Sequence, residues 1–136
     1  MRFSEKLVNV YSMIKSDRDG DMSFSHSLKW PVEKQSSIID SILINIPLQT
    51  FFCRHDELNS QYKVIDGEKR LASINNFVDN SFPFQGSIYY PGLRGKYYND
   101  FPAKYRRIID SYILTFCIIS EASDEELRDI VMKLKY

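Results

Sequence analysis

The chain has 136 residues, enough for one domain with a substantial core. Its 18 basic and 18 acidic side chains give a formal net charge of zero. Proteins that coat nucleic acid or a membrane surface are usually strongly basic, so only a local basic patch remains open. The sequence shows no secretory signal and no apolar run long enough to span a membrane. Two isolated cysteines fit a reducing compartment, and we expect a cytoplasmic location.

The first predicted element is a helix over residues 4–15. Its apolar side chains recur with helical spacing at Leu7, Val8, Tyr11 and Ile14. After an acidic turn, apolar and polar residues alternate from Met22 to Leu28, which predicts a half-buried strand. We therefore expect one domain over 1–136, in which residues 1–20 form an N-terminal helix and turn and residues 22–136 form the core.

A second helix is predicted over residues 32–45, because Pro31 suits a first helical turn and Pro47 ends the apolar stripe. Two short strands follow, from Gln49 to Cys53 and from Tyr62 to Ile65, joined by a polar segment. A third helix is expected to begin after the Asp66-Gly67 turn and to continue to Val78.

Residues 79–101 are rich in glycine, proline and aromatic residues and predict a long loop. A short helix over 102–110 and an apolar strand from Tyr112 to Ile119, covered on both faces, are expected next. Ser123 with Glu126 forms a capping box that predicts a last helix. The mixture of elements indicates an α+β fold, with a small mixed β-sheet packed with helices.

The segment Asp66-Gly67-Glu68-Lys69-Arg70 is the leading candidate site, because a strand is expected to turn there into a helix. Helix N-termini expose unpaired N–H groups and attract anions. Lys69 and Arg70 would weaken the first turn of a helix, so a bound phosphate would account for their position. The alternative is an ordinary surface turn with four solvated charges. Neither a P-loop nor a dinucleotide-binding glycine motif is present.

A second candidate is a basic surface near several tyrosines, suited to nucleic acid. Its cations are Lys96, Lys104, Arg106 and Arg107. The alternative, which we favour, is a loop whose aromatic residues fold onto the core.

Three blocks of the sequence resemble one known family. They are Trp30-x-x-x-x-Gln35-x-x-Ile38-Ile39-Asp40-Ser41-Ile42-Leu43-Ile44-Asn45-Ile46-Pro47, Val64-Ile65-Asp66-Gly67-Glu68-Lys69-Arg70-Leu71-Ala72-Ser73-Ile74-x-x-Phe77 and the tail Leu127-Arg128-Asp129-Ile130-Val131-Met132-Lys133-Leu134. They resemble the N-terminal domain of GmrSD-type modification-dependent restriction enzymes, within the ParB/sulfiredoxin-like superfamily. The chain departs from the family pattern at Lys69, where the family has Gln, and we expect no nuclease domain after the tail.

The resemblance implies a ParB/sulfiredoxin-like fold with a phosphate-binding turn and a nucleoside triphosphate as ligand or substrate. Gly67 would let backbone N–H groups reach the phosphate, with Lys69 and Arg70 as cationic ligands. Asp66 and Glu68 would be the catalytic carboxylates, and Asp66 would hold Mg²⁺. The resemblance also suggests that Gln35 and Asp40 face the same pocket.

Two functions remain open from the sequence. The first is a nucleotide-binding domain with NTP hydrolysis or nuclease activity, linked to DNA restriction and working with DNA or a separate nuclease. The second is a non-catalytic interaction protein of a phage or mobile element that inhibits or decoys a host or defence system. Pure DNA binding through residues 94–107 is a weaker third option.

Overall fold

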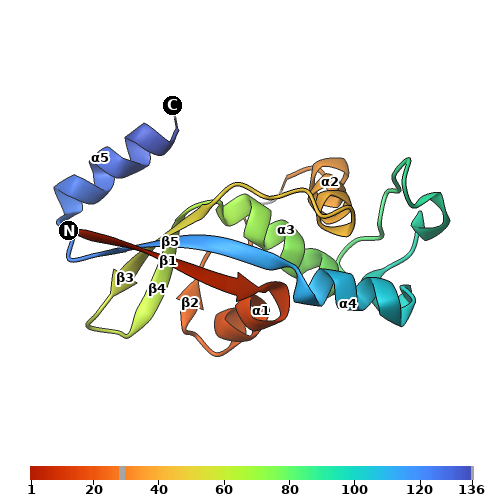
Figure 1. Ribbon diagram of the computed structural model, residues 1–136, viewed down its shortest axis with the longest axis horizontal. Helices are drawn as coiled ribbons and strands as arrows, with labels where there is room; N and C mark the ends of the chain where they lie inside the picture. The colour runs from red at the N-terminus through yellow and green to blue at the C-terminus, as the bar shows by residue number, and fades with distance from the viewer. Residues whose placement is uncertain (28–29, 136) are drawn as a thin grey trace.

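The computed structural model describes residues 1–27 and 30–135, which form a five-stranded mixed sheet with helices (Figure 1). The strands are β1 (Arg2–Asn9), β2 (Met22–Ser23), β3 (Phe51–Asp56), β4 (Gln61–Asp66) and β5 (Ile113–Ser120), in the spatial order β1-β5-β3-β4-β2. The α-helices within the described residues are α1 (Val10–Arg18), α2 (Val32–Leu43), α3 (Glu68–Val78), α4 (Ala103–Ser111) and α5 (Asp124–Leu134). The expected α+β class with a mixed sheet is confirmed, because β1–β5 and β3–β4 are antiparallel whereas β3–β5 and β2–β4 are parallel.

The predicted helix over residues 4–15 is wrong in its first half. Residues 2–9 form β1, which pairs along its whole length with β5, from Arg2 opposite Ser120 to Asn9 opposite Ile113. The helix begins only at Val10, where the Asn9 side chain accepts a hydrogen bond from the Ser12 backbone N–H. Pairing with a strand far along the chain overrides the local helical pattern.

The sheet has one buried face and one partly open face. Phe116 and Leu114 on β5 point to the buried face, and each is 1% exposed. On the other face Leu7 lies opposite Thr115, and Leu7 is 61% exposed. Ile113 on that face is 53% exposed, so the expectation that this strand is covered on both faces is wrong there.

The predicted strand from Met22 is shorter than expected. β2 contains only Met22 and Ser23, which pair with Tyr62 and Lys63 at the edge of the sheet. Residues 24–27 leave the sheet, and Leu28 lies outside the described residues. Conversely, β3 and β4 extend further than predicted, to Asp56 and from Gln61, so the connecting turn is short.

The aromatic loop after α3 folds onto the core, as the favoured alternative predicted. Phe82, Phe84 and Phe101 are buried around Phe77 of α3, with the Phe77 and Phe101 ring centroids 5.3 Å apart. Two short 3₁₀ turns, Pro91–Leu93 and Tyr98–Asp100, lie in this loop. The loop therefore builds core structure around the C-terminal end of α3.

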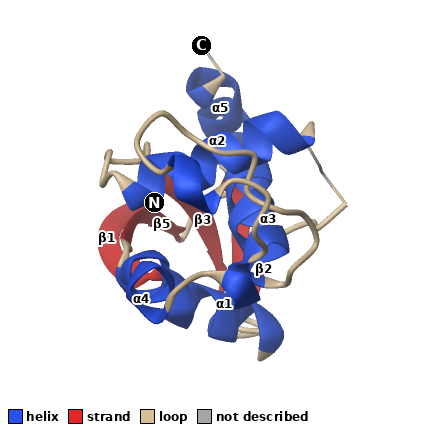
Figure 2. Ribbon diagram, turned by 90° about the vertical axis from the view of Figure 1, so that its right-hand side faces the viewer, coloured by secondary structure: helices blue, strands red, loops and turns tan. Residues whose placement is uncertain are grey.

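The last helix begins where the capping box predicts. The Ser123 hydroxyl accepts a hydrogen bond from the Glu126 N–H at 3.1 Å, and the Glu126 carboxylate accepts one from the Ser123 N–H at 2.9 Å. Figure 2 shows α5 at one end of the molecule, away from α1 and α4. Within the described residues, no helix has the length and apolar character needed to cross a membrane.

Candidate functional site

The turn between β4 and α3 is built around Gly67. Its φ of 97° lies in the left-handed region, which glycine adopts without a steric penalty. A Cβ at this position would overlap the Phe51 ring and approach Arg70 Nη2 to 2.8 Å. Two features of this position therefore require glycine: the left-handed backbone angle and the close approach of Phe51 on β3.

The first turn of α3 has no side-chain cap. Gly67 occupies the N-cap position and has no side chain to accept a hydrogen bond from the backbone N–H groups that follow. The Gly67 carbonyl accepts the regular helical bond from the Leu71 N–H at 3.1 Å. The N–H groups at the start of α3 thus lack the usual side-chain acceptor, which is the arrangement that favours an anion.

Arg70 points back toward β3. Its guanidinium carbon lies 4.1 Å from the Phe51 ring centroid, and its N–H groups donate to the backbone carbonyls of Gln49 and Thr50. The Asp66 carboxylate lies 3.8 Å from Nη2, and the Arg70 side chain is only 14% exposed. Burial lowers the pKa of the Arg70 guanidinium, and Asp66 raises it. Arg70 therefore fastens the turn to the segment before β3, which leaves it few free donors.

The other charged residues of the turn are more accessible. Lys69 is exposed, and Asp66 is in partial contact with solvent. Glu68 is half-buried, and this burial raises the pKa of its carboxyl group. The structure thus brings Asp66, Glu68, Lys69 and Arg70 together at one turn but gives them different exposures.

Gln35 and Asp40 lie on α2. Gln35 is 4% exposed; its amide donates to the Trp30 carbonyl at 2.7 Å and accepts from Asn76 Nδ2 at 3.2 Å. The amide oxygen therefore joins α2 to α3, and the amide nitrogen binds the backbone just before α2. Asp40 differs, because its Oδ1 is buried and has no hydrogen-bond partner among the described residues.

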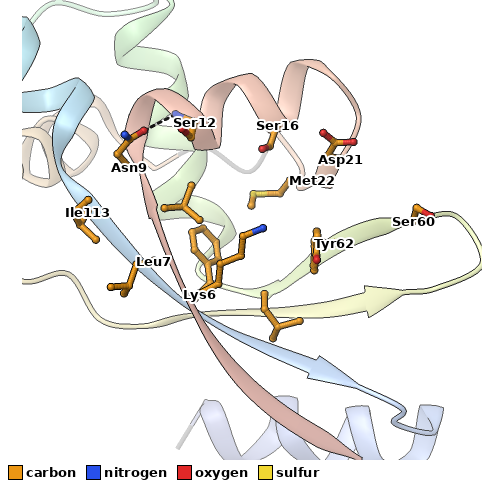
Figure 3. A pocket seen from close by; sticks show the side chains of 13 residues that line it. Lys6, Leu7, Asn9, Ser12, Ser16, Asp21, Met22, Ser60, Tyr62 and Ile113 are labelled. Atoms are coloured by element: carbon orange, nitrogen blue, oxygen red, sulfur yellow. Dashed lines mark hydrogen bonds between the residues drawn. The ribbon is translucent and has the colours of Figure 1, made fainter.

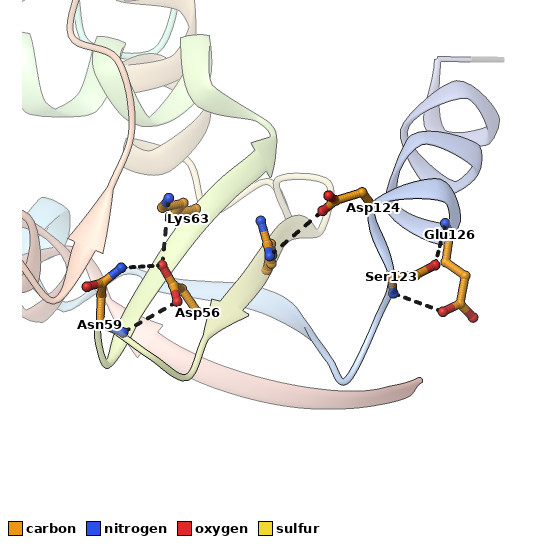
Figure 4. Close-up of polar contacts among 7 residues, drawn as sticks. Asp56, Asn59, Lys63, Ser123, Asp124 and Glu126 are labelled. Atoms are coloured by element: carbon orange, nitrogen blue, oxygen red, sulfur yellow. Dashed lines mark hydrogen bonds and ion pairs between the residues drawn. The ribbon is translucent and has the colours of Figure 1, made fainter.

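A cleft of about 620 Å³ begins at the β4–α3 turn and extends to α5. Ile65 and Glu68 line it on the side of the turn. Its three cations are Arg54, Lys63 and Arg128, and its second carboxylate is Asp124. Figure 4 shows Lys63 and Asp124 projecting from the hairpin and from the start of α5, respectively.

Ion pairs restrain two of these cations only weakly. Arg54 Nη2 lies 4.0 Å from Asp124 Oδ1, and Lys63 Nζ lies 3.7 Å from Asp56 Oδ2. For Arg128, no ion pair is found among the residues that the structure describes. The cleft therefore offers cationic groups that an anionic ligand could still engage.

Sequence reasoning missed these three cations as a group, because they are far apart in the chain. The proximity of two of them follows from the strand register, in which Arg54 on β3 lies directly opposite Lys63 on β4. The sequence alone does not give this register. Like charges at such a cross-strand position destabilise the hairpin, so the pair is costly without a counter-charge. Arg128 lies in the tail block that carries the family resemblance.

The turn has two carboxylates, of which Asp66 is in partial contact with solvent and Glu68 is half-buried in the cleft wall. Across residues 1–27 and 30–135, no three His, Cys, Asp or Glu side chains come together as a metal site. Mg²⁺ at phosphates is commonly held by one or two carboxylates, with water and phosphate oxygens completing its shell. Asp66 fits that limited role, but a dedicated protein cage would need more ligands.

The basic surface predicted near the tyrosines lies elsewhere. Figure 1 places α4 and the loop before it at the opposite end of the molecule from α5. Arg106 donates to the carbonyls of Asn99 and Phe101, whereas Lys96, Lys104 and Arg107 are exposed. These residues therefore do not form one surface with the cleft.

Comparison with known proteins identifies the family. The model of the GmrSD restriction endonuclease N-terminal domain matches residues 26–134. No curated protein and no solved structure matches the chain. Because the family match covers most of the sequence, this chain belongs to the family of the GmrSD restriction endonuclease N-terminal domain.

Proposed function

We propose that this chain binds the phosphate groups of a nucleoside triphosphate in the cleft beside the β4–α3 turn, as part of a DNA restriction system. The observation that carries the proposal is the cross-strand pair Arg54–Lys63 on the wall of a cleft that begins at an uncapped helix. Family membership supports the link to restriction. We also propose that the fold of this chain is related to the ParB/sulfiredoxin-like superfamily.

Electrostatics favours an anion at this place. Two neighbouring cations in a hairpin repel each other, and a polyphosphate between them and Arg128 removes that repulsion. The free N–H groups at the start of α3 add partial positive charge on the same side, next to Glu68. A triphosphate also has enough charge to compete with Asp124, which holds Arg54 only loosely.

The proposal assigns separate roles within the turn. Lys69 is exposed and would contact the phosphates directly, whereas Arg70 would act by holding the turn in place. Asp66 would hold Mg²⁺, which supplies positive charge to the phosphate oxygens when it is bound. Glu68 is the candidate for hydrolysis, because burial raises its pKa and makes it a better proton acceptor than an exposed glutamate.

Isothermal titration with ATP, GTP, CTP and UTP, with and without Mg²⁺, tests binding. Replacing Arg128 by alanine should weaken the preferred nucleotide by roughly tenfold, because a charge-assisted contact is lost. Lys133→Ala is the matched control on the same helix, since Lys133 pairs with Asp129 outside the cleft and should change affinity less than about twofold. Absence of binding at about 1 mM nucleotide, or equal effects of the two variants, would refute the proposal.

Hydrolysis is tested separately by phosphate release. Glu68→Gln should abolish release while retaining nucleotide binding, because the amide cannot accept the proton. If release persists in this variant, Glu68 is not the catalytic carboxylate. If the native chain binds nucleotide without releasing phosphate, it is a binding domain.

The second candidate is a non-catalytic interaction protein. The observation that favours it is the open face of the sheet, where Phe3, Leu7 and Ile113 are exposed on β1 and β5. Capture of a stoichiometric protein partner that is lost on Leu7→Ser, with no nucleotide binding, would favour this function over the first. DNA binding through Lys96, Lys104 and Arg107 would instead show a steep dependence on salt.

A further inference from the structure

A second cavity, of about 550 Å³, lies between β1, α1 and the neighbouring strands β4 and β2 (Figure 3). Its floor is apolar and includes Phe116, Ile118 and Met22. It shares no lining residue with the cleft at the β4–α3 turn. Its volume is in the range of small-molecule sites.

Lys6, an exposed residue of β1, is the cation that lines this cavity. It stands opposite Phe116 on β5, so its side chain lies on the face of the sheet that carries the buried core. Val8, two residues further along, fills the equivalent place opposite Leu114 with an apolar side chain. Lys6 is exposed on the edge strand β1, where lysine is common, and it places a cation at the open side of this apolar cavity.

The Lys6 amine has no ion-pair partner among the described residues. It lies 4.9 Å from the centroid of the Tyr62 ring. Tyr62 is itself stacked on His55, with centroids 4.8 Å apart. The amine therefore makes a cation–π contact with the Tyr62 ring, and stacking on His55 holds that ring in place.

Two hydroxyl groups add donors to the same cavity. Ser12 and Ser16 are one helical turn apart on α1, and both line it. No hydrogen bond of either hydroxyl is found within the part of the chain that the structure describes. Figure 3 shows both serines on the α1 side of the cavity, above the Lys6 side chain. Asp21 supplies the carboxylate at the margin.

We propose that this cavity binds a small organic anion with a flat apolar body, such as an aromatic carboxylate. The body lies on Met22, Phe116 and the Tyr62 ring, and the carboxylate is held by the Lys6 amine with the serine hydroxyls as neutral donors. Asp21 at the margin disfavours a ligand with a second negative charge on that side. The site is independent of the nucleotide cleft.

The test is a ¹H–¹⁵N NMR titration of the full chain with 2-naphthoate and with its neutral amide, 2-naphthamide. We expect 2-naphthoate to shift amides of β1, α1 and Tyr62 in a saturable manner, with a Kd of about 1 mM, as for a fragment-sized ligand. The amide should bind roughly tenfold more weakly, because the interaction with Lys6 is lost. This comparison needs no variant, so it does not depend on the folding of a mutant.

Variants then test whether the Lys6 amine is the group that binds the carboxylate of 2-naphthoate. Lys6→Met should weaken 2-naphthoate roughly tenfold without changing 2-naphthamide, and Lys6→Arg should retain most of the affinity. Lys15→Met on α1 is the control, because Lys15 pairs with Asp19 and does not line the cavity. The proposal is overturned if neither compound binds at roughly 10 mM, if both bind equally, or if shifts occur outside the cavity. In those cases the role of Lys6 is limited to its cation–π contact with Tyr62.

Discussion

Replacing Gly67 by alanine is the sharpest test of the geometry at the β4–α3 turn. The left-handed backbone costs an L-residue about 1–2 kcal/mol. The added Cβ also overlaps the Phe51 ring and lies 2.8 Å from Arg70 Nη2, so β3 or the arginine must move. Crowding of a packed site typically adds about 1–3 kcal/mol. We therefore expect Gly67→Ala to lower the free energy of unfolding by about 2–5 kcal/mol.

Gly20→Ala separates the two contributions. Gly20 has a φ of 82°, so it carries the same backbone penalty, but a Cβ there meets no atom within 4 Å. This control should lose only about 1–2 kcal/mol. The difference between the two variants then measures the overlap with Phe51 and Arg70.

Urea unfolding followed by far-UV circular dichroism gives both values, provided that the two variants share the native m-value. Equal losses for Gly67→Ala and Gly20→Ala would refute the argument, because they would mean that the turn does not pack closely on Phe51. Phe51→Leu in the Gly67→Ala background offers a further check. The double variant should lose less than the sum of the single losses, because the smaller side chain relieves the overlap.

Three other changes have clear expected outcomes. Ser123→Ala should destabilise the start of α5 by about 1 kcal/mol, seen as faster amide exchange in α5 alone. Glu68→Gln should raise the free energy of unfolding at pH 7 but not at pH 4 or below: burial raises the carboxyl pKa above its usual 4.5, so the folded protein loses stability as this group ionises. Tyr98→Phe should flatten the alkaline loss of stability measured by urea unfolding. Burial and the hydrogen bond to Asp110 raise the Tyr98 pKa above its usual 10.0, so its contribution is complete below about pH 10 and is lost above it.

Elements with strong local signals could be predicted from the sequence. The capping box fixes the start of α5 at Ser123, because both of its hydrogen bonds are made within four residues. Pro31 and Gly67 likewise precede α2 and α3 as expected. Such signals depend on neighbours in the chain, so they survive without knowledge of the tertiary structure.

The first strand could not be predicted in the same way. The spacing of Leu7, Val8, Tyr11 and Ile14 is helical, but residues 2–9 gain hydrogen bonds from β5, more than a hundred residues away. The candidate site likewise has a part that local sequence predicts and a part that depends on tertiary structure. The residues of the β4–α3 turn were found from their spacing, whereas the cationic cleft requires the register of β3 with β4 and the position of α5. The inward direction of Arg70 also depends on Phe51, which no local pattern places beside Gly67.

The pairing of the first strand with the last affects how the chain must be made. During synthesis residues 2–9 leave the ribosome more than a hundred residues ahead of their partner strand, residues 113–120. Until then, the backbone N–H and carbonyl groups of residues 2–9 have no partner strand, and Phe3 and Leu7 are exposed. The sheet can therefore close only after residues 113–120 have been synthesised, and until then the unpaired β1 is exposed to wrong pairing.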